Sequence, residues 1–254
     1  MKKLLVRLTI AALALLILAA VCIALFMDNL VKRGVDTVGP LLTKVEVKLD
    51  SASLSLLSGS GKLKGLFVGN PSGFKSPSAI QVGTASLAIA PGSVFSSKVI
   101  IRSINVQAPE ITFETDFKGN NLSKILANVE SFSGSSSSGS KQENNASRKL
   151  QVDDFLISGG KIHVSVTALG GQSATVALPE IHLTGLGQGP DGITVAELTK
   201  VVLNQIEKQA AQVAAGAIAD LGKNATGLTK DLGNTAADAA GKVTKGLGGL
   251  LKKN

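Results

Sequence analysis

The feature that most constrains the fold is a series of short, alternating apolar segments between Gly59 and Leu126. Apolar residues recur at every second position, and the segments end in Asn-Pro, Ala-Pro or Gly-Asn pairs, which is typical of strands joined by turns. The pattern predicts a β-meander of successive antiparallel strands. Because the intervening positions carry Ser, Thr, Lys, Arg, Gln or Glu, we expect one apolar face and one face in water.

The same alternation continues on both sides of this run. Upstream, the apolar positions change parity, from Val45, Val47 and Leu49 to Ala52, Leu54 and Leu56. A change of parity without a break predicts a bulge or bend near Asp50–Ser51, and such a bend curves a sheet. Downstream, alternation resumes after residue 148, where a Gly159-Gly160 pair predicts a turn between two further strands.

Aromatic residues are scarce, with eight Phe and neither Trp nor Tyr, although 44% of the residues are hydrophobic. Large aromatic side chains usually anchor sealed cores and protein interfaces. We therefore expect Val, Ile, Leu and Ala to cover the apolar face. The function of the protein depends on what this apolar face contacts.

The first 28 residues predict a membrane anchor. Leu8 to Met27 is a run of twenty residues without a charge, which as a helix is about 30 Å long and spans the hydrocarbon core of a bilayer. The alternative is a cleaved signal peptide, whose apolar segment is shorter. Lys2, Lys3 and Arg7 predict a cytoplasmic N-terminus and an exported remainder.

Two further segments predict helices. Leu122, Ile125, Leu126 and Val129 have helical spacing, and after Thr194 a capping box with Glu197 begins a longer amphipathic helix. The Gly/Lys-rich tail either folds on an anionic lipid surface or is a frayed end. The predicted organisation is an anchor (1–28), a stalk (29–44), a β-meander with a short helix (45–130), a disordered Ser-rich insert (131–148), further sheet (149–192), an amphipathic helix (193–222) and the tail (223–254).

No catalytic constellation is evident, and we expect neither enzymatic activity nor a cofactor or metal. His163 and His182 fall on the polar side of their strands without further ligands beside them. Asp153 and Asp154 point to opposite faces of a strand, and Glu110 and Glu114 share the polar face, where a salt bridge is the ordinary explanation. The net charge of +8 does not predict nucleic-acid binding, because Lys predominates and stacking aromatics are missing.

Four segments together resemble the AsmA-like family of Gram-negative envelope proteins. They are GKLKGLFVGNPSGF, VIIRSINVQAPEITFET, the Gly119–Leu122 stretch that opens a short helix, and LQVDDFLISGGKIHV after an insert. The likeness covers roughly residues 45–183. It implies an anchor in the inner membrane, a periplasmic half-tube of strands with an apolar trough, and a part in phospholipid movement or outer-membrane homeostasis.

The resemblance and the residue pattern meet at the apolar face. We predict a mainly β fold in which a curved antiparallel half-tube contacts phospholipid or another acyl-chain lipid. The candidate lipid-contacting residues are Val82, Leu87, Ile89, Val99, Ile101, Ile104, Val106, Ile111, Phe113, Ile157, Ile162 and Val164. The alternatives are a closed sandwich of the late-embryogenesis-abundant type with a structural role, and an assembly factor that binds other envelope proteins.

Overall fold

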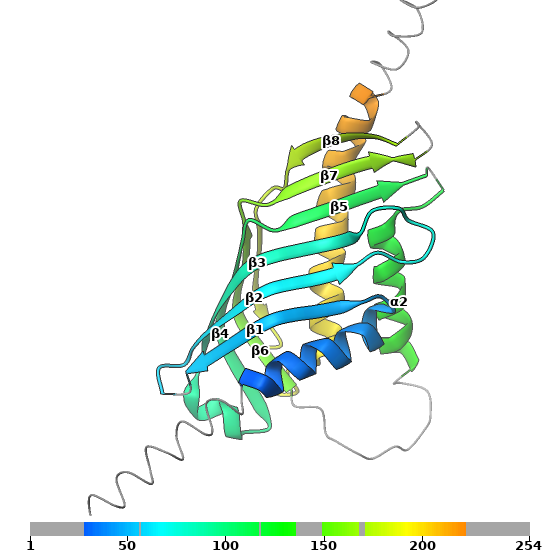
Figure 1. The fold of residues 1–254 in the computed structure, drawn as a ribbon. Coiled ribbons are helices and arrows are strands. Elements are labelled where there is room, and N and C mark those ends of the chain that lie inside the picture. The colour runs from blue at the N-terminus through cyan, green and yellow to red at the C-terminus, as the bar shows by residue number, and fades with distance from the viewer. Residues whose placement is uncertain (1–27, 56, 117, 136–148, 168–170, 222–254) are drawn as a thin grey trace, which may run out of the picture.

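A computed structural model describes residues 28–55, 57–116, 118–135, 149–167 and 171–221. In these residues the fold is mainly β, with one curved sheet and three helices (Figure 1). The strands are β1 (Val47–Ser55), β2 (Ser60–Gly69), β3 (Ser78–Ile89), β4 (Lys98–Gln107), β5 (Glu110–Thr115), β6 (Lys149–Ser158), β7 (Lys161–Val166), β8 (Gln172–Ala177) and β9 (Ile181–Leu186). The helices are residues 28–43, α2 (Asn121–Ser135) and residues 195–221, with a short 3-10 helix η1 (Pro91–Phe95).

The sheet is mixed, so the prediction of an antiparallel half-tube is wrong. Strands β1 to β4 pair antiparallel in sequence, but β4 pairs in parallel with β6 and β5 pairs in parallel with β7. The chain leaves β5 into α2 before it enters β6 (Figure 1). A crossover of this kind brings the next strand back in the same direction, which a hairpin turn does not do. The strands form one sheet, so the sandwich alternative is also wrong for the described residues.

Three long strands are each bent at the same level of the sheet. Each long strand consists of two labelled segments with a bend between them. β4 continues into β5 at Ala108-Pro109, β6 into β7 at Gly159-Gly160, and β8 into β9 at residues 178–180. Backbone hydrogen bonds maintain the pairing at the bend: Ala108 N–H to Ser158 O (2.8 Å), Lys161 N–H to Pro109 O (2.9 Å) and Leu178 N–H to Gly160 O (2.9 Å). Gly159-Gly160 therefore bends a strand, and the predicted turn at this pair is wrong.

The bend continues into β1 and β2, where the parity change predicted it. Leu49 pairs with Leu66 and Ser51 with Lys64, so Asp50 lies opposite Gly65. Burial alternates as expected up to Leu49 and then shifts by one residue, which confirms the predicted bend. Gly65 has a φ of +64°, and a Cβ there would lie 1.9 Å from Oδ2 of Asp50, so only glycine fits.

The bend explains how apolar residues stay on one face. Val106 and Ile111 are five positions apart, as are Ile157 and Ile162. In a regular strand an odd spacing places two side chains on opposite faces. At the bend, the alternation of side chains between the two faces shifts by one residue. Both members of each pair therefore lie on the concave side of the sheet, which we call the inner face.

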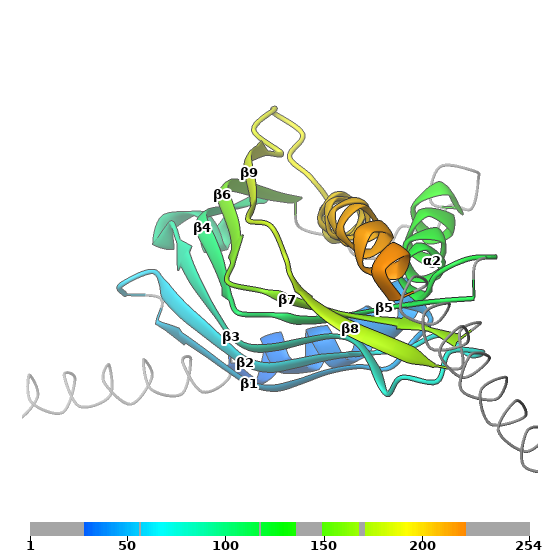
Figure 2. The same ribbon diagram turned by 90° about the horizontal axis from the view of Figure 1, so that it is seen from above.

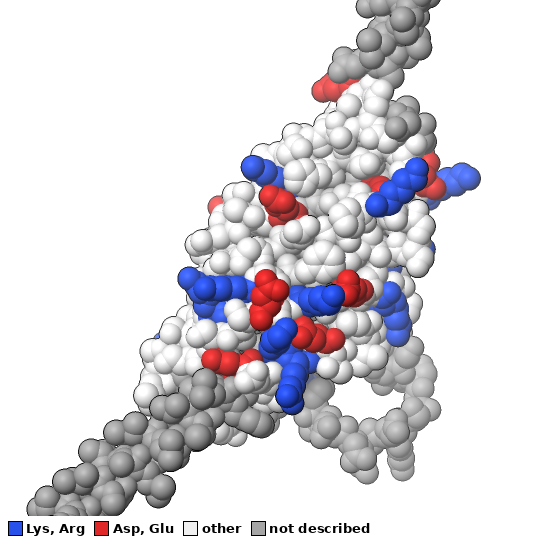
Figure 3. Space-filling model, viewed as in Figure 1, with Lys and Arg blue, Asp and Glu red and all other residues white. Residues whose placement is uncertain are grey.

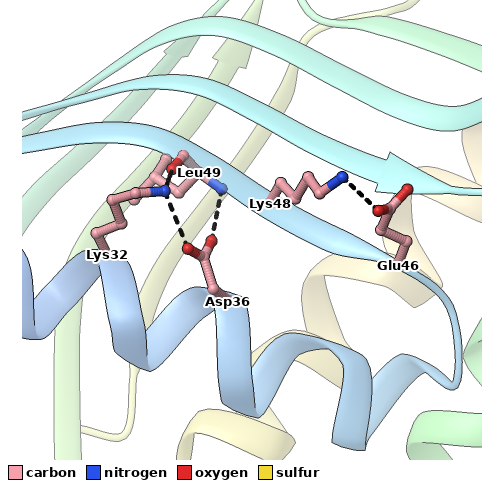
Figure 4. A network of polar contacts seen from close by, with 5 residues as sticks. All are labelled: Lys32, Asp36, Glu46, Lys48 and Leu49. Carbon is pink, nitrogen blue, oxygen red and sulfur yellow. Dashed lines mark hydrogen bonds and ion pairs between the residues drawn. The ribbon is translucent and has the colours of Figure 1, made fainter.

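The helix over residues 28–43, predicted as a stalk, runs along the free edge of β1 (Figure 4). Asp36 accepts the backbone N–H of Leu49 at 2.8 Å, and Lys32 donates to the Leu49 carbonyl and to Asp36. The hydrogen bond from Lys32 lowers the pKa of Asp36 below its usual value. Farther along, Asp28 accepts the N–H of Leu54 at 2.7 Å. These contacts satisfy backbone groups that an edge strand leaves open to a second chain.

The other two helices lie inside the curve of the sheet (Figure 2). Both contribute to one hydrophobic cluster with the strands: Leu122, Ile125, Leu126 and Val129 from α2, and Leu203, Ile206, Ala210 and Ala214 from the C-terminal helix. Thr194 and Glu197 form the predicted capping box, with the N–H of Thr194 donating to Glu197 (2.8 Å) and the N–H of Glu197 to the Thr194 hydroxyl (3.1 Å).

Several predictions fall partly or wholly outside the described residues. α2 extends to Ser135, so the first five residues of the predicted disordered insert are helical, and residues 136–148 lie outside. The tail over residues 223–254 lies outside as well. So does Leu8–Met27, and among the described helices none is both long and apolar enough to cross a membrane.

Candidate functional site

The inner face of the sheet is built from rows of apolar residues that run across the strands. The register places the members of one row side by side: Leu54, Gly61, Leu87, Ile104, Phe155 and Leu183. A neighbouring row contains Ala52, Leu63, Ala85, Val106, Ile157 and Ile181. The twelve candidate lipid-contacting residues belong to this face, but their surroundings divide them into two equal groups.

The first group is buried beneath the protein's own helices. It consists of Val82 (6% exposed), Ile111 (0%), Phe113 (6%), Ile157 (3%), Ile162 (0%) and Val164 (0%), which we call the covered half. All six belong to the hydrophobic cluster that α2 and the C-terminal helix complete. Figure 2 shows both helices above β5 and β7. These residues form a protein core, and nothing in this arrangement leaves them free for a ligand.

The second group keeps part of its apolar surface exposed. It consists of Leu87, Ile89, Val99, Ile101, Ile104 and Val106, which are half-buried and which we call the open half. All six lie on β4 or on the last three residues of β3. Ile101, Ile104 and Val106 border the hydrophobic cluster, whereas among the described residues Leu87, Ile89 and Val99 are not part of it.

Gly61 shapes the floor of the open half. Its two cross-strand partners are Leu54 on β1 and Leu87 on β3. A Cβ at Gly61 would lie 2.5 Å from Cδ2 of Leu54 and 3.2 Å from Cδ1 of Leu87. The two leucine side chains therefore lean over the glycine and make a continuous apolar surface across three strands. A larger residue at position 61 would force them apart.

The outer face of the same strands is polar, as the alternation predicted. Lys, Arg, Asp and Glu side chains are interspersed over it (Figure 3), and Glu46 and Lys48 form an ion pair there (Figure 4). A depression of about 430 Å³ lies at the bend. Its lining combines the charged Glu46, Lys48 and Asp50 with the apolar Leu66, Phe67 and Val82.

A buried carboxylate near the N-terminus of α2 escaped the sequence reasoning. Glu114 is fully buried and accepts the backbone N–H groups of Lys75 (2.7 Å) and Ser76 (2.8 Å). The predicted surface salt bridge for this residue is wrong, because the loop before β3 folds over it. Burial alone raises the pKa of Glu114, but the N–H donors of Lys75 and Ser76 outweigh it and hold the pKa below its usual value.

Asn121, the first residue of α2, joins the same network. Its side chain accepts the N–H of Glu114 (2.9 Å) and donates to the Thr112 carbonyl (2.8 Å) and to Asn70 (2.7 Å). Asn70 in turn donates to the carbonyl of Ser76 (2.7 Å). Three of the segments that carry the AsmA-like resemblance thus meet in one buried polar cluster. It fastens α2 to β5 and has the character of a structural clamp.

The two histidines lie apart, each with its own partner. His163 on β7 contacts Thr175 (3.0 Å) and lies 3.9 Å from Glu110, while His182 on β9 contacts Asp154 (2.5 Å). Their strands do not pair. Within the described ranges, no three His, Cys, Asp or Glu side chains gather closely enough to hold a metal ion.

The comparisons with known proteins leave the family open. The chain matches no family model, no curated protein and no solved structure.

Proposed function

We propose that the chain is a membrane-anchored, non-enzymatic protein that binds a phospholipid acyl chain on the open half of its inner face. The observation that supports this most is the set of half-buried apolar residues on β3 and β4. Leu87, Ile89 and Val99 present half-buried aliphatic side chains on the concave side of the sheet. Aliphatic surface of this kind matches a hydrocarbon chain and offers nothing that recognises a polar substrate.

The dimensions suit part of one acyl chain. The row from Leu54 to Ile104 crosses four strands, which at about 4.8 Å between strands is about 14 Å. Each methylene group that leaves water for this surface stabilises the complex by about 0.8 kcal/mol. A bound chain would cover the open half as the C-terminal helix covers the other half. The site thus holds a lipid tail and does not form a conduit along the whole sheet.

The proposal includes a place for the protein in the cell. The uncharged run Leu8–Met27 anchors the chain in the inner membrane, with Lys2, Lys3 and Arg7 on the cytoplasmic side and the sheet in the periplasm. Membership of the AsmA-like family and a part in phospholipid movement or envelope homeostasis belong to the same proposal. The curved sheet with an apolar concave side is consistent with it.

Phospholipid content measured by mass spectrometry tests the proposal. The full chain, purified in detergent and washed, should retain phospholipid. Leu87→Gln together with Ile104→Gln removes about 2 kcal/mol of apolar contact and should lower occupancy about tenfold or more. Ser53→Gln with Ser86→Gln changes the outer face of the same sheet and is the matched control. The proposal fails if the wild-type chain retains no lipid or if both double variants retain the same amount.

The covered half favours a second candidate, a structural or assembly factor of the envelope. Half of the apolar face is sealed by the protein's own helices, which is what a chain without a lipid ligand requires. This candidate predicts that open-half substitutions lower stability and leave lipid content unchanged. Crosslinking in intact envelopes would then reveal a protein partner.

A further inference from the structure

The end of the sheet beside the open half carries two large hydrophobic side chains that no other part of the described chain shelters. Leu57, in the turn between β1 and β2, is 94% exposed, and Phe95, at the end of η1, is 80% exposed. They are by far the most exposed large hydrophobic residues in the described chain, since the next, Leu41, is 53% exposed. Large apolar side chains that are exposed together, unlike singly scattered ones, mark a surface that contacts something else.

The two residues belong to one surface. The Gly59 carbonyl in the β1–β2 turn accepts the N–H of Ile89 at 2.6 Å, and η1 begins two residues after Ile89. A Cβ at Gly59 would lie 3.1 Å from Cγ of Pro91, so the turn and η1 are in contact. We call residues 57–59 together with η1 the tip.

The described part of the chain begins at the same end of the molecule. Asp28 accepts the N–H of Leu54 at 2.7 Å, and Leu54 lies three residues before Leu57. The twenty residues that precede Asp28 carry no charge. If they cross the inner membrane, as the proposed function states, the hydrogen bond at Asp28 holds the tip close to the point where the chain leaves the bilayer.

The charge around the tip fits a lipid surface. Residues 51–109, which contain the tip, include five Lys or Arg and no Asp or Glu. Three of these cations, Lys62, Lys98 and Arg102, lie in the parts of β2 and β4 nearest the tip. Cations beside an exposed Leu and Phe are the combination by which peripheral segments bind anionic membranes.

We infer that the tip inserts into the outer leaflet of the inner membrane, with Leu57 and Phe95 among the acyl chains and the neighbouring cations at the anionic headgroups. The open half then begins at the membrane surface, because Ile89 and Val99 flank η1 in the sequence and lie at its ends. A lipid tail reaches Leu87 and Ile104 from the bilayer without crossing bulk water. This inference rests on the proposed anchor and lipid site and names the surface from which the site is filled.

Fluorescence of a probe attached at the tip tests the inference. The full chain with Cys22→Ser and either Leu57→Cys or Phe95→Cys carries a nitrobenzoxadiazole label and is reconstituted into nanodiscs of phosphatidylethanolamine and phosphatidylglycerol. Lipids with a nitroxide on the acyl chain act as quenchers. Ser173→Cys on β8, an exposed site on a strand that pairs with none of β1 to β4, is the control. We expect blue-shifted, quenched emission at positions 57 and 95 and unquenched, water-like emission at 173.

Phospholipid bound per chain is measured in parallel on each labelled protein. Water-like emission at 57 and 95 with lipid still bound overturns the tip inference and leaves the proposed function standing. Quenching at 173 equal to that at 57 also overturns it, since the whole sheet then touches lipid. Quenching confined to the tip without any bound phospholipid supports the tip and contradicts the lipid site.

Discussion

The two halves of the inner face have the same kind of sequence and different surroundings. Ile111 and Ile162 in the covered half and Ile104 and Val106 in the open half all alternate with polar residues along their strands. The first two are fully buried beneath helices, and the second two are half-buried. Alternation therefore reveals which side chains share a face, but the packing of distant helices decides whether that face is a core or a binding surface.

The largest expected effect on stability comes from truncating one isoleucine in each half of the inner face. Ile111→Ala should lower the free energy of unfolding by about 3 kcal/mol, because truncating a fully buried side chain leaves a cavity that the surrounding core cannot fill. Ile89→Ala should cost about 1 kcal/mol, since water already reaches that side chain. Denaturant unfolding of the full chain in detergent measures both. Equal losses would show that the two halves are equally packed and would remove the distinction.

The clamp at the edge of the covered half is expected to have the next largest effect. Glu114→Gln replaces a carboxylate that accepts two backbone N–H groups and should cost about 2 kcal/mol above pH 6. Because the folded pKa lies below the usual 4.5, the contribution is present above that value and is lost as the pH falls through the lower, folded pKa.

The contribution of Glu114 can also be recognised from the pH dependence of the protein's stability. The wild-type chain should lose stability as the pH drops below about 4.5, and Glu114→Gln should lose less over the same interval. Unfolding midpoints at a series of pH values provide the comparison. Parallel curves for the two proteins would mean that Glu114 does not contribute as described.

Contact between the C-terminal helix and the sheet is tested by enlarging a small residue. Ala210 is fully buried against the strands, so Ala210→Leu should destabilise the protein by about 2 kcal/mol through overpacking. Ala215→Leu, at an exposed position of the same helix, should be neutral or slightly stabilising. If both substitutions had the same effect, the helix would not rest on the covered half.

The smallest expected effect is at the start of that helix. Thr194→Ala removes the hydroxyl that accepts the Glu197 N–H and should cost about 1 kcal/mol. Thr194→Ser keeps the hydroxyl and is the control. The loss should appear in thermal unfolding of the covered half and should leave lipid occupancy of the open half unchanged, so a fall in occupancy would indicate that the two halves are coupled.

Local patterns predicted the elements and part of the curvature. The change of parity at Asp50–Ser51 placed a bend that the register of β1 and β2 confirms, and the capping box placed the start of the last helix. These features depend on residues that are neighbours in the chain. The alternation also predicted which side chains share the inner face.

Features that depend on distant residues were missed. Gly159-Gly160 looks the same in sequence whether it reverses a strand or bends it, and only pairing with β4 and β5 decides. Glu114 alternates with Ile111 and Phe113, so the pattern placed it in water, whereas the loop at Lys75 and Ser76 covers it. Amphipathic spacing gave both helices an apolar side but did not indicate which half of the sheet they cover.

The most direct test of the central claim is a map of where a lipid tail touches the sheet. The full chain in nanodiscs is irradiated with a phospholipid that carries a diazirine on its acyl chain, and adducts are located by peptide mass spectrometry. We expect adducts on Leu87, Ile104 and their neighbours in β3 and β4, and none on β5 or β7. Adducts on Ile111 or Ile162, or none on the sheet at all, would contradict the division into a covered core and an open lipid site.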